Sequence, residues 1–264
     1  TNHPRMLAAL EKCKENGGQI ISINPLPEPG LMCFVDPQDP LKILKGGTAL
    51  TDLFLQVKVN GDVPLLKALM KLLDQADRDS EGKVFDHDFI REKTCGVEDL
   101  LQHLRKQDYN TLIHDSGISD VLVREAAEMI RSKKKIIVCW AMGVTQHENG
   151  VDNIREIVNL LLLKGSIGKP GAGTCPVRGH SNVQGDRTMG IWEAPPQAFL
   201  DKLGQVFRFE APTQHGYAVT DAIKAMYDKK ASVFFAMGGN FLSATPDTEY
   251  TAQALRNCRL TMQV

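Results

Sequence analysis

The stretch KKIIVCWAMGVTQHENGVDNIREIVNLLLLKG, residues 134–165, decides the fold class. Residues 134–143 contain an apolar run typical of a buried strand, and residues 151–165 have the length and pattern of a buried helix. A glycine-containing polar loop joins them. A strand that leads through a short loop into a helix predicts parallel strands with helical crossovers.

The same alternation recurs along the chain. We predict a Rossmann-like α/β domain that binds a dinucleotide over residues 1–180, with its first strand missing, and part of a second α/β cofactor-binding domain over residues 181–264. Because the chain begins within a helical pattern and stops at an apolar strand pattern, we expect an internal piece of a longer polypeptide.

Asp62 is predicted as an N-cap, and Ser119 as another. The other predicted strands are 19–24, 52–58, 231–239 and 259–264, and the predicted helices are 5–16, 63–76, several within 80–132, 216–230 and 247–258.

Composition excludes several classes of protein. The 264 residues carry 31 Lys and Arg against 32 Asp and Glu, so no nucleic-acid partner is expected. No apolar run approaches the length of a membrane-spanning helix. The six cysteines form no CxxC pair, so we expect no metal site in this chain and reduced thiols in the cytoplasm. Cys139 lies in an apolar run and is expected to be a small core residue.

Four loops follow predicted strands: residues 23–30, 60–62, 141–150 and 236–241. All four are rich in glycine, amide or proline residues, and we expect them at the same edge of one sheet, where ligands bind in such folds. Each loop alone is no more than a turn, because neither GxGxxG nor GxxxxGK[ST] occurs. Together they indicate a large nucleotide-like ligand. The glycine-rich stretch 165–185 either lets the backbone approach that ligand closely or connects two domains flexibly.

Residues 140–190, WAMGVTQHENGVDNIREIVNLLLLKGSIGKPGAGTCPVRGHSNVQGDRTMG, resemble the signature region of molybdopterin oxidoreductases. These are large molybdenum or tungsten enzymes that include formate dehydrogenases, nitrate reductases and dimethyl sulfoxide reductase. The resemblance is closest to formate-dehydrogenase-like alpha subunits. It extends through residues 2–30, 59–70 and 236–241, and therefore covers nearly the whole chain.

The resemblance implies a bis-molybdopterin guanine dinucleotide cofactor, with molybdenum or tungsten, held between two α/β domains. Asn24 stands where the family often has an acidic residue facing a guanosine, so that hydrogen bond changes character here. The cofactor contacts implied by the resemblance are Asn24, Pro25, Gly61, Asp62, Met142, Gly143, Gln146, His147, Gly179, Gly238, Gly239 and Asn240.

Arg178 and His180 are the catalytic candidates. In formate-dehydrogenase-like members the arginine of the Arg-Gly step lies beside the metal and the anionic substrate, where a guanidinium can hold an oxyanion with two hydrogen bonds. The alternative is a surface arginine that closes a loop onto a carboxylate such as Asp186. His180 either donates a hydrogen bond to a carbonyl or shuttles a proton near neutral pH.

The family's cysteine cluster for an iron–sulfur centre and its Cys, selenocysteine or Ser metal ligand do not occur in this chain. We therefore expect this chain alone to be inactive, with no bound metal or pterin, and an iron–sulfur cluster to belong to a preceding part of the parent. For that parent the resemblance implies two-electron redox chemistry on a small substrate, with formate as the nearest guess, and an electron-transfer partner protein. The alternatives are a nucleotide-binding or assembly module without redox chemistry and, third, the middle domain of a thiamine-diphosphate enzyme.

Overall fold

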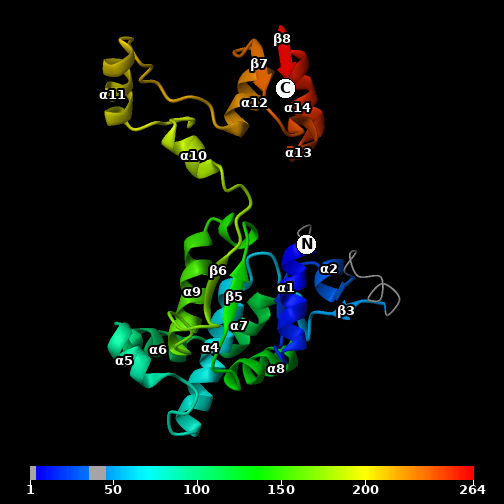
Figure 1. Ribbon diagram of the computed structural model, residues 1–264, viewed down its shortest axis with the longest axis vertical. Coiled ribbons are helices and arrows are strands. Elements are labelled where there is room, and N and C mark those ends of the chain that lie inside the picture. The colour runs from blue at the N-terminus through cyan, green and yellow to red at the C-terminus, as the bar shows by residue number, and fades with distance from the viewer. Residues whose placement is uncertain (1–3, 36–45) are drawn as a thin grey trace. The chain divides into compact units, whose positions relative to one another are not determined.

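The computed structural model describes residues 4–35 and 46–264 of the chain. The chain divides into two compact units, Thr1–Gly179 and His180–Val264 (Figure 1). Both units combine helices with a parallel strand pair, which confirms the predicted α/β class. The assignment of cofactor-binding domains to residues 1–180 and 181–264 stays a prediction.

Two parallel strand pairs form the sheet structure of the first unit. β1 (Ile21–Ile23) pairs with β4 (Leu53–Leu55), and β5 (Ile137–Trp140) pairs with β6 (Gly173–Pro176). Because each pair is parallel, the loops that follow its two strands leave from the same edge.

The strands of the described residues form four two-stranded sheets, so the expectation of one sheet with four loops on a common edge is wrong. The pairings span at most four residues, and no backbone ladder joins one pair to the next in the part of the chain that the structure describes. The loops at residues 23–30 and 60–62 share the edge after β1 and β4, and the loop at residues 141–150 shares an edge with the segment after β6. The loop at residues 236–241 belongs to the second unit.

The remaining elements of the first unit are mostly helices, as their apolar spacing predicts. They are α1 (Pro4–Glu15), α2 (Pro29–Met32), the antiparallel pair β2 (Cys33–Phe34) and β3 (Thr48–Ala49), α4 (Asp62–Asp79), α5 (His87–Lys93), α6 (Val97–Lys106), α7 (Tyr109–Ser116), α8 (Asp120–Arg131), the 3₁₀ turn η1 (Gly143–Thr145) and α9 (Gly150–Leu163).

Helix α4 packs into two separate apolar cores. One of its faces joins a core with β4, α7 and α8, and another joins a core with α5, α6 and α9. Its buried apolar residues recur every three or four positions, which is the spacing that places side chains on defined helical faces. The first face carries Leu65, Ala68 and Leu69, and the second carries Leu66, Met70 and Leu73.

The predicted N-cap role of Asp62 is wrong. Gly61 is the N-cap, and its carbonyl already accepts the Leu65 N–H at 3.1 Å, so the helix begins one residue earlier than predicted. Asp62 therefore lies in the first helical turn, where a carboxylate is favourable toward the helix dipole. Ser119 is the N-cap of α8 as predicted, although its side chain makes no capping hydrogen bond.

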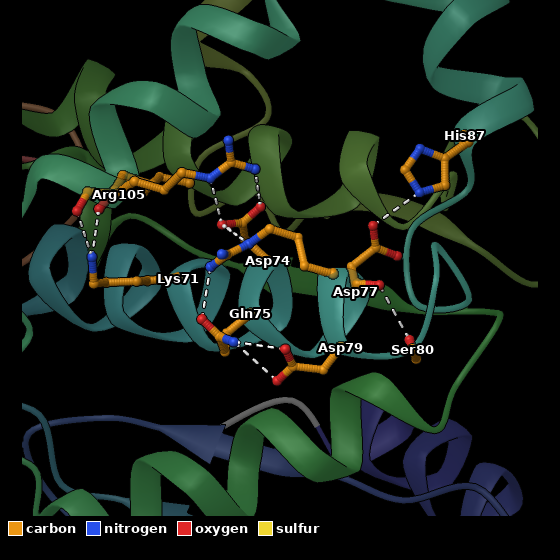
Figure 2. A network of polar contacts seen from close by, with 10 residues as sticks. Lys71, Asp74, Gln75, Asp77, Asp79, Ser80, His87 and Arg105 are labelled. Carbon is orange, nitrogen blue, oxygen red and sulfur yellow. Dashed lines mark hydrogen bonds and ion pairs between the residues drawn. The ribbon is translucent and has the colours of Figure 1, made fainter.

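Buried carboxylates at the C-terminal half of α4 hold neighbouring segments in place (Figure 2). Asp74 accepts two hydrogen bonds from Arg105, at 2.9 and 2.6 Å. Asp77 accepts the N–H groups of Val84 and Phe85 at 2.9 and 2.8 Å through one oxygen, and contacts His87 through the other. Because their lone pairs are used within the protein, we assign these carboxylates a structural role.

The strand β5 presents alternate residues to opposite sides. Val138 and Trp140 pack against the core of α4 and α9, whereas Ile137 and Cys139 lie on the other, exposed face. The expectation that Cys139 is a core residue is therefore wrong, because the period of two in a strand places it on the outer face.

The second unit is built around one parallel pair, β7 (Val233–Ala236) with β8 (Leu260–Gln263), as predicted. Ile223, Met226 and Ala254 form its small core between two packed helices, α12 and α14. Its helices are α10 (Val183–Thr188), α11 (Gln197–Phe207), α12 (Val219–Tyr227), α13 (Phe241–Ala244) and α14 (Thr248–Arg256).

Candidate functional site

The turn after β1 is held by its own hydrogen bonds. The Asn24 N–H reaches the Leu55 carbonyl at 3.1 Å, and its side-chain Nδ2 donates to the Leu26 carbonyl at 2.7 Å. Gln56, just after β4, donates from Nε2 to the Pro25 carbonyl at 3.0 Å. The two neighbouring strand ends are thereby tied together, and the Asn24 amide is already engaged within its turn.

The start of α4 is close-packed around Gly61. A Cβ at this position would lie 2.8 Å from the Ser116 carbonyl oxygen and 3.0 Å from that of Lys58. Both neighbours are backbone atoms, so only glycine fits without displacement of the chain. The glycine that the sequence marked as a ligand contact thus has a packing role of its own.

Asp62, in the first turn of α4, and His147, in the loop after β5, interact electrostatically. Burial raises the pKa of the Asp62 carboxyl, and the charge of His147 acts in the opposite direction. The start of α4 and the loop after β5 therefore come near one another.

The loop between β5 and α9 folds back onto the start of the helix. The Met142 carbonyl accepts the Thr145 N–H at 3.1 Å, and the His147 carbonyl accepts the Gly150 N–H at 3.0 Å. A Cβ at Gly150 would lie 2.6 Å from the Thr145 carbonyl oxygen, so this helix start also requires glycine. Gly143 has open space where a Cβ would be.

Two amide oxygens at the start of α9 are buried without a hydrogen-bond partner. Asn153 is fully buried and donates from Nδ2 to the Val144 carbonyl at 2.8 Å, but its Oδ1 has no hydrogen-bond partner. The Oδ1 of Asn149, the N-cap residue, has none either. Buried polar atoms nearly always have a hydrogen-bond partner. A donor group of a ligand bound at this helix N-terminus would supply the partner that these two oxygens lack. In this respect the residues present fit a phosphorylated heterocyclic cofactor.

Arg178 and Gly179 are the second and third residues after β6, beside the loop that follows β5. Gly179 lies so close to Met142 that a Cβ would overlap the Met142 sulfur atom. The Arg178 side chain is exposed. His180 is exposed and opens the second unit.

The loop after β7 carries the remaining predicted contacts. Gly238 and Gly239 have φ of 69° and 74°, values that favour glycine, and a Cβ on either would meet open space. The Asn240 Oδ1 caps the short helix α13 by accepting the Ser243 N–H at 3.3 Å. These three residues belong to the second unit, which is described by itself.

The structure thus brings Asp62 near His147, and it brings Met142 into contact with Gly179. Asn24 and Pro25 directly follow β1, at one end of the β1–β4 pair. Gln146 lies in the same exposed loop as Met142, as C-cap of η1. The sequence reasoning missed Asn149 and Asn153. The Asn-Gly step at residues 149–150 was the available signal, because it marks a helix start next to the candidate loop.

Comparison with known proteins identifies the family. The model of the molybdopterin oxidoreductase family matches residues 42–263. The chain belongs to this family. An uncharacterized oxidoreductase of Mycobacterium tuberculosis H37Rv is 47% identical over the whole chain, which spans 34% of that relative. The alpha subunit of an F420-dependent formate dehydrogenase 1 of Methanococcus maripaludis is 28% identical over 98% of the chain and 36% of its own length.

A solved structure is similar to this chain in fold. The structure of acetylene hydratase from Pelobacter acetylenicus matches 98% of this chain and 36% of its own, with a TM-score of 0.59 and 16% identity. This likeness concerns the fold alone. The chain spans about a third of the length of the curated relatives it matches.

Within residues 4–35 and 46–264, no three His, Cys, Asp or Glu side chains gather as a metal site. None of the helices among these residues combines the length and the apolar character that crossing a bilayer requires.

Proposed function

We propose that this chain is the dinucleotide-holding part of a molybdenum or tungsten oxidoreductase with bis-molybdopterin guanine dinucleotide as cofactor. The observation that carries the proposal is the pair of unpartnered buried acceptors, Asn149 and Asn153 Oδ1, at the N-terminus of α9 in a chain of this family. The N–H groups of a pterin or guanine ring are donors of the kind these oxygens lack.

Two helix N-termini support the binding of the phosphates. Both α4 and α9 begin just after the end of a parallel strand pair, and helix N-termini carry partial positive charge and free N–H groups. Gly143 leaves open space at the start of η1, so a ligand could approach the backbone there. The carboxyl oxygens of Asp62 would accept hydrogen bonds from a guanine or its ribose. We propose that Gly238, Gly239 and Asn240 contact a second nucleotide in the second unit.

Arg178 is proposed to hold an anionic substrate, with formate as the first choice because a formate dehydrogenase alpha subunit is among the relatives. Its guanidinium stays charged at every relevant pH and can bind a carboxylate through two parallel hydrogen bonds. His180 follows two residues later and is proposed to take up or release a proton near neutral pH. The bound metal centre supplies two-electron transfer when the cofactor is present.

We further propose a cytoplasmic enzyme that passes electrons to a partner protein. The six cysteines, all free thiols in the described residues, support a reducing compartment. An iron–sulfur cluster, if the parent has one, belongs to sequence outside this chain.

The test is metal and pterin analysis of the full-length protein. We expect one molybdenum or tungsten, two pterins and two guanine nucleotides per chain. Protein without metal and pterin, purified from cells that load another molybdenum enzyme, would leave the nucleotide-binding or assembly alternative.

A matched pair of variants tests whether Asn149 contacts the cofactor. Asn149→Ala removes one unpartnered acceptor and should lower pterin content several-fold with little change in folding. Asn159→Ala, on the same helix, removes only a 3.2 Å hydrogen bond to Glu156 and should leave the content unchanged. Equal content in the two variants would show that Asn149 is not a cofactor contact.

A further inference from the structure

Cys139 and Cys175 lie directly opposite one another in the parallel pair of β5 and β6. The register is fixed on both sides. The Gly173 N–H reaches the Ile136 carbonyl at 2.9 Å, and the Val177 N–H reaches the Trp140 carbonyl at 2.7 Å. Paired residues on adjacent strands have side chains on the same face, so the two thiols share one side of the sheet.

The spacing of the strands suits a disulfide. Neighbouring strands lie about 4.8 Å apart, and bridged cysteines have Cα atoms about 4.4–6.8 Å apart. The two side chains interact with each other, because the neighbouring Cys175 contributes to the raised pKa of Cys139. Bond formation therefore requires only a short approach of the two sulfur atoms.

Both thiols are exposed in the described structure, so small molecules can reach them. Partial burial and the neighbouring Cys175 thiol raise the pKa of Cys139 to about 11. Cys139 thus keeps its proton, so we assign the first attack to Cys175. The other cysteines lie on α1, β2, the turn before α6 and the turn before β8, and the structure pairs none of them with another thiol.

We propose that Cys139 and Cys175 form a reversible disulfide, a thiol switch between the two strands that lead into the loops of Met142 and Gly179. The oxidant is a low-molecular-weight disulfide. The Cys175 thiolate attacks it, forms a mixed disulfide and releases one small thiolate. Cys139 then gives up its proton and attacks the Cys175 sulfur, which forms the bond between the strands and releases the second small thiolate. Two electrons pass to the small disulfide, and the two thiol protons end on its two thiol products.

The disulfide would affect the candidate site through the two strands that lead into its loops. Trp140 and Pro176 are the next residues along the two strands, and the loops after them hold Met142 in contact with Gly179. Drawing the two sulfur atoms to about 2.05 Å shifts the strand ends relative to each other and so alters that contact. The inference does not depend on the proposed redox activity.

To test the proposal, the full-length protein is treated with glutathione disulfide, and mass spectrometry identifies which cysteines are cross-linked or modified. The two cysteines lie in different tryptic peptides, residues 136–155 and 165–178, so a cross-link between them is directly visible. We expect this cross-link, its loss on addition of dithiothreitol, and unchanged alkylation of Cys13, Cys33, Cys95 and Cys258.

Variants make the result specific. Cys139→Ser should stop at a glutathione adduct on Cys175, whereas Cys95→Ser, which removes another exposed thiol, should still form the cross-link. Unchanged alkylation of Cys139 and Cys175 after oxidation, or glutathione on each without a cross-link, would overturn the proposal. Because the readout is peptide mass, it is independent of whether the protein carries a pterin cofactor.

Discussion

Arg105 holds both carboxylate oxygens of Asp74, with Nε 2.9 Å from Oδ2 and Nη2 2.6 Å from Oδ1. The carboxylate is almost fully buried on α4, and the guanidinium reaches it from α6 (Figure 2). A planar guanidinium matches both oxygens at once, which a lysine cannot do. Arg78 offers Asp74 a second, longer contact at 3.4 Å.

Arg105→Lys should therefore destabilise the protein by about 1–2 kcal/mol, because a buried carboxylate keeps only part of its hydrogen bonding. Thermal unfolding measures the loss. Arg91→Lys is the control, since the Arg91–Asp88 pair is exposed on both sides and such pairs contribute little. Equal melting temperatures for the two variants would show that the Asp74 contact is not a stabilising one.

Asp62→Asn should change how stability depends on pH. Since burial raises the pKa of Asp62 in the folded protein, the folded state binds the proton more tightly than the unfolded state. The stabilisation from this group is full at pH values below the ordinary carboxyl pKa and is lost as the pH rises through the higher, folded pKa. The difference in melting temperature between the variant and the wild type should therefore shift in favour of the variant as the pH rises above the ordinary carboxyl pKa of about 4.

His147 offers a second measurement on the same carboxyl. Its charge opposes the effect of burial on the Asp62 pKa, so His147→Gln should enlarge the loss of stability with rising pH. The whole effect should stay below about 1 kcal/mol, since solvent still screens part of the carboxyl. Parallel melting curves for wild type and Asp62→Asn across this range would contradict the prediction.

Gly61→Ala and Gly143→Ala should separate packing from ligand contact. The new Cβ at residue 61 meets two backbone carbonyls, so we expect a loss of about 1–3 kcal/mol in stability. The new Cβ at residue 143 meets open space, so stability should stay within about 0.5 kcal/mol while pterin content falls. A normal pterin load in Gly143→Ala would remove residue 143 from the candidate site.

Arg178→Lys keeps the positive charge but loses the planar guanidinium, which can form two parallel hydrogen bonds. If Arg178 stabilises the transition state, turnover of formate should fall at least about 10-fold, or about 1.4 kcal/mol, with a normal metal load in the full-length protein. If it anchors the cofactor, metal and pterin should fall together with turnover. Arg155→Lys is the control, because Arg155 is exposed and pairs only with Asp152 on its own helix. Normal turnover and metal load in both Arg178→Lys and Arg178→Ala would exclude both roles.

The strands that the sequence predicts are those with an apolar signal of their own. β5 and β7 carry the runs IVCW and VFFA, and both were predicted. β6 was missed because its residues, GTCP, include glycine and proline, which are rare in strands. It is a strand because β5 supplies a backbone partner, and that pairing is tertiary information.

The candidate site shows the same limit. The loop at residues 141–150 could be found from glycine and amide residues after a predicted strand. Whether Asn153 has a partner for its Oδ1, or whether Cys139 faces Cys175, depends on packing and register, which composition does not reveal. The proposed cofactor comes from the resemblance to a family, whereas the two unpartnered amide oxygens come from the structure.

The sharing of α4 by two apolar cores has a consequence for how the first unit unfolds. Leu65 and Leu69 belong to one core and Leu66 and Met70 to the other, on adjacent positions of the same helix. Neither core can open fully while the other keeps this helix in place, so the two are linked in a single cooperative event. Amide hydrogen exchange should accordingly be slowest along α4, at one common rate on both of its faces, and a cavity made on either face should speed exchange on the other.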